Sequence, residues 1–171
     1  MKTVVKIGTK HTLNEMEQSI VKSVAKNRFA KNRKENIKNS KIGDQSNEDT
    51  DTEGFGAEMA FCKLFNVFPD FSIKPRSSKE DKGDAILHVE NGIVDVKSTC
   101  YKTGRLITPT WKNKGSVDVY ALMTGKFPTY EFRGFMKAST LMQKERIRDM
   151  GYGKDSYVAE QDELKDSGVA I

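Results

Sequence analysis

The sequence predicts a single α/β domain over residues 1–171, built on a central mixed β-sheet flanked by helices. Two early segments repeat apolar side chains at helical spacing. Residues 82–97 then hold two runs of Val, Ile and Leu around Asn91 and Gly92, which is typical of a β-hairpin with a tight turn. Residues 117–123 are almost continuously apolar, as expected of a strand inside a sheet.

The first part of the chain is predicted to form two helices joined by a polar loop. A capping-box pattern at Thr12 to Glu15, followed by apolar residues three and four positions apart, predicts a helix over residues 13–32. Residues 36–54 are almost wholly polar and cannot bury a core, so we expect a mobile loop there. A second helix is expected to begin at Gly54, with Glu58 at the border of its apolar stripe.

The remaining elements alternate between short strands and turns. Residues 1–7 are expected to be a short strand or an ordered lead-in, and residues 71–74 a first strand closed by Pro75. After the hairpin, the patterns predict strands over residues 106–109, 117–123, 129–136 and 157–159, with a helix over residues 140–148. The strands 117–123 and 129–136 are expected to pair as a second hairpin.

The charge balance permits a nucleic-acid partner. Lys and Arg number 29 against 24 Asp and Glu, which gives a net charge of +5 and a pI near 9.1. The candidate phosphate contacts lie at the end of the first helix and in an aromatic-rich stretch near Tyr101 and Trp111: Lys26, Arg28, Lys31, Arg33, Lys34, Arg105 and Lys112. The alternatives are a solvated helix end, whose cations favour the helix C-terminus, and an ordinary loop anchored by tryptophan.

The cysteines and histidines argue against a structural zinc site. Cys62 and Cys100 are the only cysteines, His11 and His88 are the only histidines, and none of them is closely spaced. We therefore expect reduced thiols in a cytoplasmic protein. No apolar run reaches the length of a signal peptide or a membrane span, which agrees with that expectation.

The hairpin carries charged residues that strands ordinarily avoid. Asp84, Asp95 and Lys97 interrupt the apolar runs, and alternation along the strand places Asp95 and Lys97 on the face opposite Val94 and Val96. If Asn91 and Gly92 form a two-residue loop, however, Asp84 lies roughly 13 Å from the residue opposite Asp95. A wider loop or splayed strands would bring the two carboxylates together, and the sequence leaves both open.

Two carboxylates and a lysine suit Mg²⁺-assisted phosphodiester hydrolysis. The pattern of Asp84, ten residues, then Asp95-Val96-Lys97 resembles the PD-(D/E)xK nuclease superfamily, which includes restriction-endonuclease-like and Holliday-junction-resolvase-like enzymes. The resemblance implies that Asp84 and Asp95 bind the metal, that Lys97 assists the attacking water, and that a helix glutamate, here Glu58, joins them. Gly83 stands where the family usually has proline, and the literal Pro69-Asp70 pair is interpreted as a turn.

The resemblance also implies a fold, an activity and a partner. We expect a restriction-endonuclease-like core and a Mg²⁺-dependent DNA endonuclease that leaves 5′-phosphate ends, with Mn²⁺ as a substitute metal and the Val96 carbonyl as a further ligand. It leaves open a homodimer for cutting both strands. The alternatives are a nucleic-acid-binding module without catalysis on the same scaffold, and a structural hairpin in a protein that binds another protein.

Overall fold

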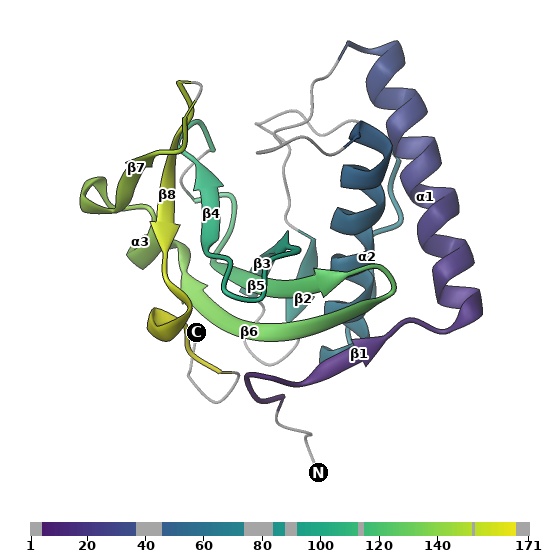
Figure 1. Cartoon of the computed structure of the whole chain (residues 1–171), viewed down its shortest axis with the longest axis horizontal. Helices are drawn as coiled ribbons and strands as arrows, with labels where there is room; N and C mark the ends of the chain where they lie inside the picture. The colour runs from purple at the N-terminus through teal and green to yellow at the C-terminus, as the bar shows by residue number, and fades with distance from the viewer. Residues whose placement is uncertain are drawn as a thin grey trace.

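A computed structural model describes residues 5–36, 46–73, 84–87, 92–112, 115–151 and 153–166 (Figure 1). The elements in chain order are β1 (Lys10–Thr12), α1 (Glu15–Lys34), α2 (Asn47–Phe65), β2 (Ala85–Leu87), β3 (Gly92–Thr99), β4 (Leu106–Pro109), β5 (Val119–Lys126), β6 (Thr129–Lys137), α3 (Ala138–Leu141), η1 (Lys144–Arg146), β7 (Ile147–Asp149), β8 (Asp155–Ala159) and η2 (Gln161–Glu163). None of the helices in these ranges combines the length and apolar character needed to cross a bilayer.

The strands form two sheets. The larger sheet has the order β1-β6-β5-β3-β2, in which β3 and β5 run parallel and the other neighbours run antiparallel. The smaller sheet has the order β4-β8-β7 and is antiparallel throughout. The predicted mixed sheet of an α/β protein is therefore confirmed, as is the pairing of β5 with β6.

Each face of the larger sheet has its own core. Helices α1 and α2 lie on one face, where Phe55 and Phe61 of α2 pack among the apolar residues of β3, β5 and β6 (Figure 1). On the other face, Tyr120 and Leu122 of β5 pack against Leu106 of β4 and residues of α3 and β8. Because strand side chains alternate between faces, a strand buried on both sides reads as a continuous apolar run, as predicted for residues 117–123.

The second face is covered differently from the prediction. Residues 140–148 do not form the one continuous helix that was predicted, because α3 ends at Leu141, Gln143 is extended and only the three-residue 3₁₀ helix η1 follows. Residues Ile147–Asp149 pair with β8 instead, and Ile147 packs against the second core. The short smaller sheet thus takes the place of a helical layer here, because its strand pairing outweighs the local helical pattern.

Helix α1 begins two residues later than the predicted capping box. Thr12 pairs with Thr129 of β6, and their hydroxyl oxygens lie 3.0 Å apart. Asn14 caps the helix instead: its side chain accepts from the Glu17 N–H at 2.9 Å, and Glu17 accepts from the Asn14 N–H at 3.0 Å. The capping box is therefore present, but the strand pairing of Thr12 displaces it along the chain.

Helix α2 begins seven residues before the predicted Gly54, so the expected polar loop over residues 36–54 is wrong for its second half. The Ser46 hydroxyl accepts from the Asp49 N–H at 3.0 Å, and the acidic Glu48 and Asp49 lie in the first turn, where the helix dipole favours negative charge. Residues 37–45 of the expected loop lie outside the described residues. In the described parts, neither residues 5–7 nor residues 71–73 form a strand; β1 forms at residues 10–12 instead.

Glu53 ties the polar start of α2 to the β5–β6 turn. Its carboxylate accepts from the Phe127 N–H at 3.0 and 3.1 Å and from the Tyr130 hydroxyl at 2.9 Å. Burial, followed by the Glu53 charge, raises the pKa of Tyr130 and keeps its hydroxyl protonated as a donor. Gly56, one turn later, leaves room for the same hydroxyl, since a Cβ there would clash with it. The tertiary contact explains why a polar segment is helical.

We expect Glu53→Ala to destabilise the fold by about 1–3 kcal/mol, because it leaves the Phe127 N–H and the Tyr130 hydroxyl without their acceptor. Urea unfolding would measure the change. The exposed Glu48 in the first turn provides the matched control, and Glu48→Ala should cost less than about 1 kcal/mol. Equal losses in the two variants would contradict this account.

Candidate functional site

The first hairpin brings Asp84 to the edge of β3, the strand that carries Asp95. Ala85 pairs with Val94 and Leu87 with Gly92, and the Asp84 N–H also bonds to the Val94 carbonyl, so Asp84 lies beside Val94, the residue before Asp95. This register differs by four residues from the one that a two-residue loop at Asn91 and Gly92 would give, because Val94 pairs with Ala85 and Gly92 is part of β3; residues 88–91 lie outside the described part of the chain. The prediction of a tight turn at Asn91 and Gly92 is therefore wrong for Gly92, and the shift by an even number of residues leaves the strand faces unchanged.

Alternation along β3 separates its apolar and charged residues as predicted. Val94 and Val96 lie in the core beneath the helices. Asp95 and Lys97 lie on the opposite face, in register with Tyr120 and Leu122 of β5, which belong to the second core. The charged pair is therefore set beside an apolar layer rather than in open solvent.

Asp84 lies just before the first residue of β2 and bonds to the edge of β3. Its N–H donates to the Val94 carbonyl at 2.7 Å, and its Oδ2 accepts from the Val96 N–H at 2.6 Å. In a strand, the N–H and the carbonyl of one residue point to the same neighbour, so the Val96 carbonyl also faces this edge. Asp84, Asp95 and Val96, three of the four predicted metal-binding residues, are thus gathered within one short segment of the sheet edge.

Asp95 is the most buried charge of the site, with 3% of its surface exposed. Its Oδ1 lies 2.5 Å from the Lys97 Nζ, and its Oδ2 lies 3.0 Å from the Lys112 Nζ. Burial would raise the pKa of Asp95, but the two ammonium groups outweigh it and hold that pKa below its usual value. The carboxylate is consequently ionised and neutralised by two lysines.

Lys97 remains charged within this cluster. Burial would lower the pKa of Lys97, but the Asp95 carboxylate outweighs it and the net shift is upward; Asp84 adds to it. The ammonium also lies 5.8 Å from the centre of the Tyr120 ring. Burial, and then the Asp95 charge, raises the pKa of that tyrosine. Lys97 is therefore a fixed cation between a carboxylate and an aromatic ring.

Glu58 approaches the site from the helix side. Its Oε2 lies 3.4 Å from Arg28 Nη1. Burial raises the pKa of the Cys62 thiol to about 12, with contributions from the Glu58 and Asp84 charges, so both carboxylates lie near this thiol. In the described ranges, however, no three His, Cys, Asp or Glu side chains are gathered closely enough to hold a metal ion. The oxygen donors that this edge offers to a hard cation are the Asp84 and Asp95 carboxylates and the Val96 carbonyl, and the part of Glu58 stays a prediction.

The predicted phosphate contacts divide into two groups. Lys26, Lys31, Arg33 and Lys34 are exposed along the end of α1, and Arg105 is an exposed residue 3.7 Å from Glu160. Arg28, in contrast, is turned inward: it donates to the Asp70 and Ser72 carbonyls at 2.7 and 3.0 Å and lies over the Phe55 ring. The prediction that Arg28 contacts phosphate is not supported by this packing, because its donors hold the 70–72 segment to the helix.

Lys112 also differs from its predicted place on an outer surface. Its side chain is 13% exposed, and its ammonium bonds to Asp95, which lies 17 residues earlier in the chain. Sequence spacing carries no signal for this contact, because the connection through β4 returns the chain to the Asp95 face. Lys112 is therefore a third charged member of the site together with Asp95 and Lys97.

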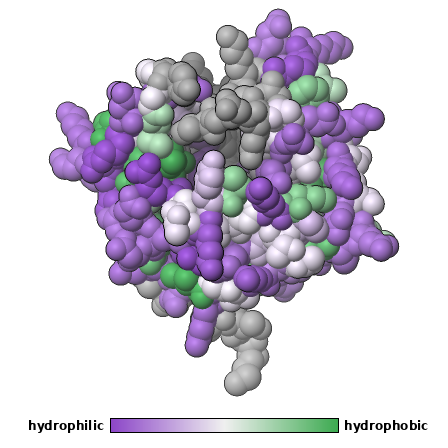
Figure 2. All heavy atoms as spheres, viewed as in Figure 1, coloured by the Kyte–Doolittle hydropathy of each residue, from purple (hydrophilic) through white to green (hydrophobic). Residues whose placement is uncertain are grey.

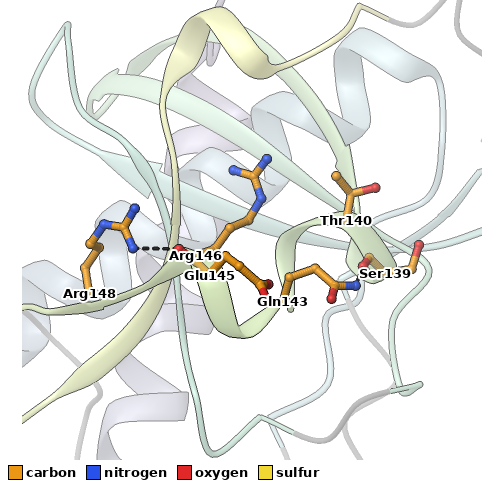
Figure 3. Close-up of a pocket in the computed structure, with 6 residues that line it drawn as sticks. All are labelled: Ser139, Thr140, Gln143, Glu145, Arg146 and Arg148. Carbon is orange, nitrogen blue, oxygen red and sulfur yellow. Dashed lines mark hydrogen bonds between the residues drawn. The ribbon is translucent and has the colours of Figure 1, made fainter.

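A separate hollow of about 580 Å³ lies where α3 and η1 meet β7 (Figure 3). Its lining residues are Ser139, Thr140, Gln143, Glu145, Arg146 and Arg148. The Arg146 guanidinium lies 2.9 Å from Glu163, and Arg148 donates to the Glu145 carbonyl at 2.7 Å, as the dashed line shows (Figure 3). Both arginines bond to other residues of the chain, and none of the predicted catalytic residues lines this hollow.

The Asp95 cluster should make the free energy of unfolding acid-sensitive in a defined range. Because the folded-state pKa of Asp95 lies below its ordinary value of 3.8, the stabilisation is complete above pH 3.8 and is lost as the pH falls through the folded value. In urea unfolding between about pH 6 and about pH 2, the difference in free energy of unfolding between the wild type and Asp95→Asn should shrink as the pH falls. The exposed Asp162→Asn serves as control, and a constant difference from Asp95→Asn across the range would contradict the assignment.

Comparisons with known proteins give one match. No curated protein and no solved structure matches the chain. A family model described as a family of unknown function, DUF5843, matches residues 3–169. Because that match covers nearly the whole sequence, the chain belongs to the DUF5843 family.

Proposed function

We propose that this chain is a metal-dependent DNA endonuclease with a restriction-endonuclease-like core, which hydrolyses phosphodiester bonds and leaves 5′-phosphate ends. One observation carries the proposal: the Asp84 carboxylate accepts from the N–H of Val96, the residue between Asp95 and Lys97, which form an ion pair on one face of β3. Two carboxylates and a lysine at one sheet edge are the groups that metal-assisted phosphodiester hydrolysis uses.

The arrangement of the larger sheet supports the same proposal. The parallel pair β3 and β5 lies inside a mixed sheet, and α2 with Glu58 covers the face opposite Asp95 and Lys97. The resemblance drawn from the sequence implies a helix, a hairpin with the acids and a further strand pair in this order. A restriction-endonuclease-like core accounts for that order, although the smaller sheet β4-β8-β7 stands where a helical layer was expected.

The donor set at the edge of β3 suits a hard divalent cation. Mg²⁺ commonly takes one or two protein carboxylates and keeps several waters, so Asp84, Asp95 and the Val96 carbonyl would hold it without a third acid. When bound, such an ion acidifies water and offsets charge on the phosphate, and Mn²⁺ supplies the same chemistry. Glu58 is not required for this set, and its part in catalysis stays a prediction.

The lysines supply the positive charge at the reacting phosphate. Lys97 is held 2.5 Å from Asp95 and stays protonated, so its ammonium is fixed where it can orient the attacking water or stabilise developing negative charge. Lys112 adds a second ammonium on the other oxygen of Asp95. Both cations are placed by the fold before any substrate arrives, which reduces the reorganisation that the reaction requires.

One observation favours a different function, a nucleic-acid-binding module without catalysis. Both oxygens of Asp95 are bonded to lysine ammonium groups, an arrangement that neutralises the carboxylate without any metal. In such a module, Asp95 would act only to position Lys97 and Lys112 toward phosphates. Binding that is independent of Mg²⁺, with no cleavage, distinguishes this candidate from the nuclease.

We expect Lys97→Ala and Asp84→Asn each to lower DNA cleavage by at least about 100-fold, because each removes a group that acts on the scissile phosphate or its metal. The measurement is a time course on supercoiled plasmid, linear duplex, single strand and four-way junction, with Mg²⁺, Mn²⁺ or EDTA. Comparing how much plasmid is nicked with how much is linearised also shows whether two copies act together, as a homodimer would.

The exposed Lys102→Ala is the matched control and should cut like the wild type. Cleavage that survives in both active-site variants would indicate a contaminating nuclease and refute the assignment. Folded protein that binds DNA and cuts none of the four substrates would favour the binding module.

The exposed end of α1 is proposed to contact the phosphate backbone. Replacing Lys26, Lys31 and Lys34 together by alanine should weaken duplex binding regardless of base sequence and reduce the slope of log affinity against log salt by about 0.9 for each phosphate that the lysines no longer neutralise. Replacing Lys10, Lys126 and Lys137, which are also exposed, changes the net charge equally. If both triple variants show the same decrease in affinity and slope, the effect is one of total charge and the assigned surface is wrong.

A further inference from the structure

An exposed aromatic ring adjoins the buried charges of the site. Trp111 is the chain's single tryptophan, and 59% of its surface is exposed. The next residue, Lys112, is 13% exposed and bonds to Asp95 at 3.0 Å. A single step along the chain therefore leads from an indole in solvent to the ammonium group that neutralises Asp95.

The segment that carries both side chains is anchored to the fold. The Lys112 N–H donates to the Pro109 carbonyl at 3.2 Å, which closes a turn at the end of β4. The Thr110 N–H and hydroxyl both donate to the Asp155 carbonyl at 3.3 and 3.2 Å. With Lys112 fixed on Asp95 as well, the backbone at Trp111 is held at a set distance from the site.

The chemistry around Trp111 indicates what its ring contacts. The face of the molecule seen in Figure 2 is mostly hydrophilic, with scattered apolar areas. Indole rings stack on nucleobases, and lysines beside them bind the adjoining phosphates. In a closed duplex, however, each base is already stacked between its neighbours, so only an unpaired base can lie on a side-chain ring.

We infer that this site takes a strand with unpaired nucleotides, with Trp111 stacked on one base while Lys112 and Lys97 face its phosphates. This inference rests on the proposed nuclease function and narrows its substrate to single strands, flaps or splayed ends. The sequence positions support it, because Trp111 immediately precedes Lys112, the cation that bonds to Asp95. The cluster that would cut the strand and the ring that would hold it are therefore joined through one short anchored segment.

The single tryptophan makes a direct test possible. Intrinsic fluorescence is measured in EDTA, which prevents cleavage, during titration with a single-stranded oligonucleotide and with a duplex of the same length. We expect quenching by the single strand and little change with the duplex, because stacking on a base alters indole emission. No quenching, or equal quenching by both, overturns the inference.

Variants then connect the ring to affinity. By fluorescence anisotropy of a labelled oligonucleotide, Trp111→Ala should weaken single-strand binding about 10- to 100-fold and leave duplex binding unchanged. Trp111→Phe should restore most of the affinity. Phe68→Ala is the matched control, because Phe68 is 79% exposed and lies outside the site. Circular dichroism establishes that each variant is folded, and a loss shared with Phe68→Ala contradicts the inference.

Cleavage separates failure of this inference from failure of the proposed function. Lys97-dependent cutting without Trp111 stacking refutes the preference for unpaired strands and leaves the nuclease intact. Stacking without cutting of any substrate refutes the nuclease and supports single-strand binding by the same surface. Cutting that prefers single-stranded or splayed substrates, with the preference lost in Trp111→Ala, supports both.

Discussion

The buried ion cluster of Asp95, Lys97 and Lys112 is the interaction on which the rest of the site depends. An ionised carboxylate with 3% of its surface exposed is strongly unfavourable alone, and two ammonium groups offset that cost. Removing one partner would leave an uncompensated charge beside Tyr120 and the second core. The cluster also joins β3 to the turn after β4, so it helps to fix the path of the segment that carries Trp111.

The two faces of the larger sheet differ: one packs against the helices, and the other carries the charged residues of the site. On the helix side, Val94 and Val96 contribute to a continuous apolar core with α2, while the same strand presents Asp95 and Lys97 to the other side. A sheet with one helical face is rigid, and rigid elements hold reactive groups more accurately than loops do. Asp84 lies just before β2 and takes the place of a further strand residue beside β3: its carboxylate accepts a hydrogen bond from the Val96 N–H, which has no partner in β2. The acidic edge is thus also a structural device that satisfies the open side of β3.

The charged residues of the proposed interface serve two purposes. Arg28 and Lys112 look alike in the sequence, as basic residues near aromatics, but both point inward, one toward Glu58 and one toward Asp95. The lysines at the end of α1 stay exposed and are the ones proposed to meet the phosphate backbone. A surface of this kind would attract a polyanion over a distance, while the buried cations act only on a phosphate that has entered the site. Trp111 is exposed, like the lysines of α1, but the next residue, Lys112, is one of the buried cations.

The sequence by itself determined the features that depend on neighbours along the chain. Apolar runs identified the strands of the hairpin and the doubly buried β5, period-two alternation gave the faces of β3, and residue order singled out Asp84, Asp95 and Lys97. Tertiary structure decided everything that depends on distant partners: the β2–β3 register that brings Asp84 to Val96, the contact of Lys112 with Asp95, the inward turn of Arg28, the early start of α2 around Glu53 and the strand at Ile147–Asp149. The physical reason is that local periodicity reports which side of an element faces the core, whereas register and ion pairing follow from packing between segments far apart in sequence.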